Sequence, residues 1–292
     1  RADMDALPIQ GHNEFRHRSR NHGKMHACGH DGHTAMLLAA AKYLADHRNF
    51  EGTVNLIFQP AEEGGAGAQR MIEDGLFDKF PCDAVFGMHN WPGLPVGEFA
   101  VMPGPMMASS DEFEIRITGR GGHAAMPHQT VDPVVVGSQI VQALQTIVSR
   151  RTNPADATVV TVTQFHSGDA INVIPGEAVL SGTSRAFQPA VQDLIEEGIR
   201  RICAGVAAAH GAQIAVRYER RYPPTINTPA EAAFAAAVMR DIIGEKNVHT
   251  GLAPTMGAED FAFMLQVRPG AYAWIRSEEH TSELQSQFRI SY

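Results

Sequence analysis

The first third of the chain alternates short, continuously apolar runs with segments of helical spacing. Residues 53–60 and 83–89 are apolar runs bounded by turn residues, which is typical of strands buried on both faces of a sheet. Residues 34–47 and 67–77 carry apolar positions at helical spacing and lie before and between those runs. This alternation predicts an α/β fold with a mostly parallel sheet and helices on its faces.

The hydrophobic pattern changes near residue 109. Residues 111–120 alternate apolar and polar positions, which is typical of a sheet with one face in water. A helix, two strands, a second helix and a last strand are then predicted at residues 131–150, 157–165, 176–187, 191–211 and 212–220. This β-α-β-β-α-β order is that of a ferredoxin-like α+β unit. We therefore expect a second domain, inserted into the first.

The predicted domain boundaries follow these changes. Residues 1–108 form the first part of the α/β domain, 109–220 the inserted domain and 221–275 the return to the first domain, opening with a helical pattern at 228–244. Residues 276–292 break abruptly from the apolar run before them, and RSEEHTSELQS resembles a translated sequencing-library adapter. We interpret that segment as a non-native tail, with a native polar tail as the alternative.

Composition limits the classes of partner. The 292 residues carry a formal net charge of −8, which argues against nucleic acid or an anionic membrane surface as the main partner. The apolar runs all stop short of the roughly 18 residues that a membrane-spanning helix needs. The 3 cysteines are widely spaced, which fits a reducing compartment better than a disulfide framework, so we expect a cytoplasmic protein.

Side chains that can bind metal ions gather where the predicted strands end. They are Cys28 and His30 before the first helix, Glu62 and Glu63 after the first apolar run, and His89 at the end of the second. Carboxyl ends of parallel strands share one edge of a sheet, so we expect these side chains to lie together. A thiolate, imidazoles and a carboxylate suit Zn²⁺ or a similar first-row ion. One glutamate of the pair can then coordinate while the other takes a proton from metal-bound water.

Each of these residues, taken singly, has a plainer interpretation. Cys28 can be a small buried apolar side chain, the glutamates can lie in a solvated loop, and His89 can be a core histidine. His26 and His33 belong to the same cluster, and we expect them to support the site or pack against it rather than bind metal. A cysteine hydrolase that uses Cys28 with a neighbouring histidine is a second functional hypothesis.

A set of motifs occurs in order between residue 1 and about residue 275: RADMDALP, HACGHDGHTAMLL, QPAEEGGAGA, GMHNWPGLPVG, GRGGHAAMPH, INVIPGEA and MGAEDFAFM. Together they resemble the hippurate hydrolase and N-acyl-amino-acid amidohydrolase branch of the aminoacylase/carboxypeptidase metallopeptidase family; plant auxin-conjugate hydrolases are similar. The resemblance implies metal-dependent hydrolysis of the amide bond of small N-acyl amino acids such as hippurate. A related aminopeptidase or desuccinylase is the milder alternative.

The resemblance also implies a role for each site residue. Two divalent ions, Zn²⁺, Mn²⁺, Co²⁺ or Ni²⁺, would be bound by Cys28, His30, Glu63 and His89. Cys28 would bridge the ions, and Glu62 would be the general acid/base. Asp5 stands where relatives outside this branch keep an aspartate behind a metal-binding histidine, and Asp3 takes the place of that histidine here.

The inserted domain resembles the family's lid and dimerisation domain, which implies a homodimer formed through it. His123 would polarise the scissile carbonyl, within one subunit or across the dimer, and Asn172 and Arg185 would receive the substrate carboxylate. The plainer alternatives are an ordinary turn at the glycines before His123 and an ion pair of Arg185 within the domain.

The chain departs from the family pattern at both ends. Its first residues read as the middle of a strand, and the family's last metal-binding histidine lies beyond residue 275, where His280 has the wrong context to replace it. We therefore expect a fragment of a longer enzyme. A fragment that binds metal without turning over substrate is the third functional hypothesis.

Overall fold

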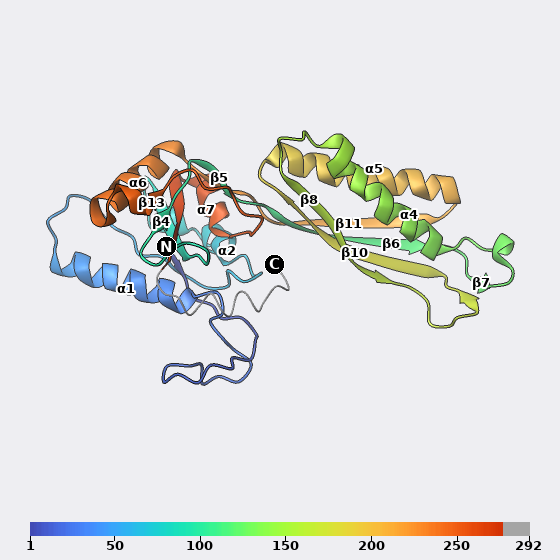
Figure 1. Ribbon diagram of the computed structural model, residues 1–292, viewed down its shortest axis with the longest axis horizontal. Coiled ribbons are helices and arrows are strands. Elements are labelled where there is room, and N and C mark those ends of the chain that lie inside the picture. Colours follow the sequence, from blue (N-terminus) through green and yellow to red (C-terminus); the bar gives the residue numbers. More distant parts are fainter. Residues whose placement is uncertain (277–292) are drawn as a thin grey trace. The chain divides into compact units, whose positions relative to one another are not determined.

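The computed structural model describes residues 1–276, so the adapter-like tail lies, apart from Arg276, outside the described residues. The fold is mixed α/β, and the chain forms two compact units (Figure 1). Unit 1 comprises Arg1–Met107 and the chain from Thr225 onward, and unit 2 is Ala108–Pro224. No helix in the described part is long and apolar enough to cross a membrane.

Unit 1 contains a four-stranded sheet with the order β13-β4-β14-β3. Its strands are β3 (Val85–Asn90), β4 (Phe99–Ala100), β13 (Val248–His249) and β14 (Gly270–Ile275). β14 runs parallel to β3 and β13 parallel to β4, but β14 and β4 are antiparallel. The sheet is therefore mixed, and the expected mostly parallel sheet is not confirmed. Residues 91–98, between β3 and β4, are fewer than the dozen or so that a parallel crossover needs, so the chain turns back.

Helices and two further strand pairs complete unit 1. Its helices are α1 (His30–Asp46), α2 (Gly67–Glu73), α3 (Leu76–Lys79), α6 (Pro229–Ile243) and α7 (Phe261–Val267), with a 3₁₀ turn at Glu245–Asn247. Two further strand pairs are β1 (Ala2–Asp3) with β2 (Phe58–Gln59), which is parallel, and β5 (Gly104–Met107) with β12 (Thr225–Asn227), which is antiparallel.

β14 is a strand that the sequence patterns did not predict. Its residues alternate between two buried layers, as strand geometry requires. Ala271 and Ala273 pack against α6, whereas Tyr272 and Trp274 join the cluster that includes Phe261 of α7. β14 is thus buried on both faces and holds β3 in register, with Trp274 opposite His89.

The predicted strand at 53–60 is assigned only at β2, where it pairs in parallel with β1. The main chain extends this pairing, because the Met4 N–H donates to the Gln59 carbonyl at 2.9 Å. The amino group of Arg1 donates to the Phe86 carbonyl of β3 at 2.6 Å. The ends of β1, β2 and β3 therefore lie at one edge of unit 1.

Unit 2 is an antiparallel sheet with the order β11-β6-β10-β8, and two helices cover one of its faces (Figure 1). The strands are β6 (Ser110–Thr118), β8 (Thr158–His166), β10 (Glu177–Ala186) and β11 (Gln213–Tyr222). The helices are α4 (Pro133–Thr146), continued by a π-helical turn at Ile147–Arg151, and α5 (Pro189–His210). β7 (Gly122–His123) pairs with β9 (Val173–Ile174), and a 3₁₀ turn spans Pro127–Gln129. All six elements predicted here from periodicity are present.

Candidate metal centre

Cys28 and His30 flank Gly29 at the start of α1. Gly29 has φ 84° and ψ 15°, a left-handed conformation that L side chains rarely adopt. A Cβ atom at this position would also lie 3.4 Å from the side-chain nitrogen of Asn90. Because the chain turns sharply at Gly29, α1 begins at His30, earlier than predicted, and the side chains on both sides of the turn face β3.

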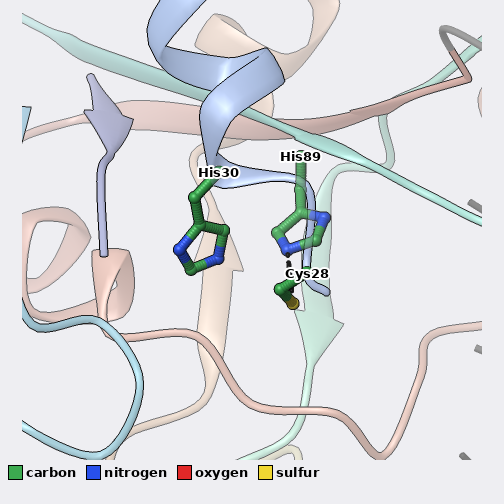
Figure 2. A group of neighbouring side chains, drawn as sticks. All are labelled: Cys28, His30 and His89. Carbon is green, nitrogen blue, oxygen red and sulfur yellow. Dashed lines mark hydrogen bonds between the residues drawn. The ribbon is translucent and has the colours of Figure 1, made fainter. Parts of the chain in front are cut away.

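Figure 2 shows the imidazoles of His30 and His89 side by side, with the Cys28 side chain next to His89. Cys28 Sγ lies 3.6 Å from His89 Nε2, and one ligand atom from each of the three residues lies within 4.8 Å of the others. The start of α1 and the end of β3 thus bring Cys28 and His30 next to His89, which lies 61 residues after Cys28.

Each of these imidazoles uses its Nδ1–H within the protein. His30 Nδ1 donates to the Asp5 carboxylate at 3.1 Å, and His89 Nδ1 donates to the Asn90 carbonyl at 2.7 Å. Each Nε2 therefore presents its lone pair to the cluster, as metal-binding histidines do. Burial, with the neighbouring His33, lowers the pKa of His89 to about 3, so this ring is neutral near pH 7. Burial also opposes the charged form of His30, but the Asp5 hydrogen bond and nearby carboxylates outweigh it and raise its pKa.

Glu62 and Glu63 lie on a tight loop between β2 and α2. Ala61 and Ala66 on this loop have φ values of 57° and 51°, which are uncommon for residues other than glycine. At Gly67 an added Cβ would lie 1.7 Å from the Pro60 carbonyl oxygen, so only glycine fits this crossing. Strained backbone of this kind persists where the surrounding structure holds it, and it is frequent at functional sites.

The two glutamates of this loop have different surroundings. The Glu63 N–H donates to the Asp5 carboxylate at 2.9 Å, and burial raises the pKa of the Glu63 side chain. Burial, followed by the charges of Glu259 and Asp260, raises the pKa of Glu62 well above its usual range. Ligand atoms of Glu62, Glu63 and His30 lie within 4.8 Å of one another. His30 is therefore common to this group and to the cluster with Cys28 and His89.

Two buried atoms of this site have no hydrogen-bond partner in the described structure, and both face the cluster. They are His30 Nε2 and Glu63 Oε1, which lie 3.9 Å apart. Leaving such atoms unpaired is costly, and most buried polar atoms in proteins are paired. Both atoms can reach one ion at a typical ligand distance of about 2.1 Å. The donor set therefore fits a divalent metal ion.

A buried ion-pair network that sequence reasoning missed lies beside this cluster. Arg1 donates to Asp3, Glu259 and Asp260 at 2.8, 2.8 and 2.9 Å, and all four side chains are buried. Burial would raise the pKa of Asp3, but Arg1 and His33 outweigh it and hold that pKa well below its usual range. For Asp260, burial and the charge of Glu259 raise the pKa to about 7. A sequence signal existed for part of this network, since Arg1 precedes β1 by one residue and lies two residues before Asp3, the spacing that puts side chains on one face of an extended segment.

The three residues assigned to the inserted domain lie in unit 2, and they are not all adjacent there. His123 in β7 and Asn172 are exposed neighbours, because the Ala124 N–H donates to the Asn172 carbonyl at 3.0 Å. Arg185 is buried near the opposite end of β10. β10 is ten residues long, so at about 3.3 Å per residue its ends lie roughly 30 Å apart. Burial lowers the pKa of Arg185 although the carboxylates of Asp111 and Glu112 oppose the shift.

The model of peptidase family M20/M25/M40 matches residues 1–286. The chain belongs to this family. A hippurate hydrolase of Campylobacter jejuni subsp. jejuni is 45% identical over 278 residues, which cover 95% of this chain and 72% of that relative. An N-acyl-L-amino acid amidohydrolase of Geobacillus stearothermophilus is 48% identical over 229 residues, covering 78% of this chain and 61% of the relative. The resemblance found in the motifs is therefore confirmed.

A solved structure within the family supports the fold assignment. A dinuclear metal-binding peptidase of family M20 from Bacillus subtilis matches with a TM-score of 0.81 and 38% identity, over 96% of this chain and 73% of that one. Both proteins share the mixed α/β fold.

Proposed function

We propose that the chain is a metal-dependent amidohydrolase that cleaves the amide bond of N-acyl amino acids such as hippurate, releasing a carboxylic acid and a free amino acid. The observation that carries the proposal is the buried donor cluster at the shared strand edge, in which His30 Nε2 and Glu63 Oε1 have no partner within the described protein. Family membership and the names of the two relatives support the reaction and the substrate class.

We assign the metal ligands by the donor types and their spacing. Cys28, His30, Glu63 and His89 would hold two divalent ions, Zn²⁺, Mn²⁺, Co²⁺ or Ni²⁺. The dinuclear relative supports the stoichiometry. When bound, such ions polarise the scissile carbonyl and lower the pKa of water, which supplies a nucleophile near neutral pH. Asp5 holds the His30 ring and the Glu63 main chain in place through its two hydrogen bonds.

Glu62 is the proton carrier in this proposal. Burial and the adjacent carboxylates raise its pKa, which makes Glu62 a stronger base toward a water proton than an ordinary carboxylate. Glu62 takes the proton from the attacking water and later delivers it to the leaving amine. Glu63, next in sequence, keeps its lone pair for the metal.

We further propose that residues 1–108 and 221–275 form the catalytic domain and residues 109–220 a ferredoxin-like lid, which supplies His123, Asn172 and Arg185. Nδ1 of His123 accepts a hydrogen bond from the Ala125 N–H at 3.1 Å. The proton is therefore on Nε2, where it can donate to a developing oxyanion.

We also propose a homodimer through the lid, which the separation of Asn172 and Arg185 supports. Asn172 precedes β9, before the start of β10, and Arg185 lies near the end of β10, so one carboxylate can meet both only if two copies contribute. β8 is an edge strand of the unit 2 sheet, and edge strands are ready sites for pairing between chains.

We also propose a cytoplasmic location. The three cysteines are free thiols, which is usual for proteins of a reducing compartment.

The cysteine-hydrolase hypothesis is weakened for the pair of Cys28 and His89. Cys28 Sγ is close to His89 Nε2, but such an enzyme needs the imidazole to hold the thiol proton. A pKa of about 3 for His89 leaves that ring unable to do so.

The test is metal content by mass spectrometry on the purified chain, together with hippurate hydrolysis before and after EDTA and after Zn²⁺ or Mn²⁺ is restored. We expect bound metal, loss of hydrolysis with EDTA and recovery with the ion. Activity that survives EDTA but is lost to iodoacetamide would instead support the cysteine hydrolase. Bound metal without turnover of any N-acyl amino acid would support the inactive fragment, and a folded chain without metal would contradict the proposed site.

A further inference from the structure

His33 lies one helical turn after His30 on α1 and is buried against both imidazoles of the donor cluster. Its ring centroid is 4.5 Å from that of His89 and 5.4 Å from that of His30. His33 offers a ligand atom within 4.8 Å of Asp3 and His30, which makes it a candidate ligand by proximity. Its hydrogen bonds argue for a different role.

Both ring nitrogens of His33 are already engaged. The Asn90 N–H donates to His33 Nε2 at 2.7 Å, so this nitrogen carries the lone pair and Nδ1 carries the proton. His33 Nδ1 then donates to the Asp3 carboxylate at 2.5 Å. Because its one lone pair is used by Asn90, the His33 ring has none left for an ion.

Asp3, which accepts the hydrogen bond from His33, is itself held in place by burial and by an ion pair. Asp3 is fully buried, and its other carboxylate oxygen accepts from Arg1 at 2.8 Å. Arg1 in turn donates to the buried carboxylates of Glu259 and Asp260. The acceptor that selects the tautomer of His33 is therefore held by residues from both ends of the described chain.

Asn90, which donates to His33, also contacts the proposed metal ligand His89. The main chain of Asn90 makes two bonds at this site: its N–H is held by His33 Nε2, and its carbonyl accepts from His89 Nδ1. Holding the Asn90 N–H restrains the backbone of this residue, and its carbonyl, in the next peptide unit, is the acceptor that orients the His89 ring. The Nε2 of His89 then faces Cys28 Sγ.

We infer that His33 is a positioning residue of the metal centre, with Asp3 selecting its tautomer and Asn90 transmitting its position to His89. This inference rests on the proposed metal-dependent function. Groups of this kind around metal ligands typically change metal affinity about 10–100-fold when they are removed.

Two substitutions separate the two hydrogen bonds. In His33→Gln, the amide oxygen comes close to the position of Nε2 and can still accept from the Asn90 N–H. In His33→Asn, the amide nitrogen comes close to the position of Nδ1 and can still donate to Asp3, but nothing reaches Asn90. His47→Gln is the matched control, since His47 is the exposed residue that follows α1 at its other end.

The readouts are Co²⁺ affinity by competition with a chelating dye and the visible spectrum of the bound Co²⁺, which reports ligand geometry without any turnover. We expect His33→Asn to bind Co²⁺ about 10–100-fold more weakly with an altered spectrum. His33→Gln should retain most of the affinity, and His47→Gln should match the parent chain. Equal losses in both His33 variants, or no loss in either, would overturn the inference while leaving the proposed function standing. A parent chain that binds no Co²⁺ would instead remove the proposed function.

A measurement on the unsubstituted chain covers the case in which a variant does not fold. Long-range ¹H–¹⁵N spectra of ¹⁵N-histidine-labelled protein report the tautomer of each ring. We expect His33 to carry its proton on Nδ1 both without and with Zn²⁺, while Nε2 of His30 and His89 shifts on Zn²⁺ addition. A zinc-induced shift at His33 Nε2 would make His33 a ligand and overturn the inference.

Discussion

The two units each bury a polar cluster, and the clusters differ in how far the protein itself satisfies them. In unit 2, the fully buried Asp111 accepts from Gln192 Nε2 and Tyr218 Oη, each at 2.7 Å. Tyr218 Oη also lies 2.8 Å from Ser184 Oγ. Burial raises the pKa of Asp111, and the hydrogen bonds from Tyr218 and Gln192 counter part of that shift. This network is closed.

The cluster in unit 1 is open at its centre. The Asp5 carboxylate accepts hydrogen bonds from His30 Nδ1 and from the Glu63 N–H. His30 Nε2 and Glu63 Oε1 nevertheless face one another without a partner in the described structure. Both clusters are buried and contain shifted pKa values, so neither property separates a functional site from a structural one. The difference lies in convergent polar atoms that the described protein leaves unpaired and that a bound cation can satisfy.

The largest effect that this comparison predicts is on turnover in unit 1. Glu62→Gln removes the proton carrier but leaves the ligands in place, so we expect hippurate hydrolysis to fall about 10²–10⁴-fold. Metal content, measured by mass spectrometry, should stay at the level of the parent chain. Glu73→Gln, an exposed glutamate on α2, is the control and should be fully active. Substantial activity in Glu62→Gln would remove Glu62 from the proton-transfer role.

A smaller effect, on stability alone, is predicted for the closed network. Asp111→Ala leaves the buried amide of Gln192 and the hydroxyl of Tyr218 without their acceptor, which should cost about 1–3 kcal/mol. Urea unfolding followed by hydrogen exchange should place the loss in unit 2, with Co²⁺ affinity unchanged. Asp193→Ala removes an exposed ion pair with Arg220 and should cost about 0–1 kcal/mol. A loss of metal affinity in Asp111→Ala would contradict the assignment of a purely structural role to the unit 2 cluster.

The smallest effect is a difference in thiol reactivity. Burial raises the pKa of Cys203 to about 11, so only about one part in a thousand is thiolate at pH 8 and its alkylation should be slow. Zn²⁺ should protect Cys28 from iodoacetamide but leave Cys82, a half-buried thiol of the same unit, unprotected. Peptide mass spectrometry measures all three rates in one sample. Equal Cys28 rates with and without Zn²⁺ would argue against a Cys28–metal bond.

The success of the sequence patterns differed between the units for a physical reason. In unit 2 each strand has one wet face, so alternation marks the strands, and the long amphipathic α4 and α5 are equally clear. In unit 1 the apolar run at 53–60 is strand only at β2. β14 was missed although its continuous apolar run is the same kind of signal that predicted β3, because such a run carries no alternation and is ambiguous by itself.

The sequence by itself determined the family and the secondary structure of unit 2, since spaced motifs and periodicity are local properties. It also named the donor residues that the structure brings together, and their roles as ligands, like the placing of His33 outside the ligand set, stay predictions. Tertiary structure alone decided which lone pairs of those donors remain available. Whether a histidine nitrogen faces an ion or a peptide N–H depends on residues distant in the chain, and here Asp5, Asp3 and Asn90 make that choice for His30, His33 and His89.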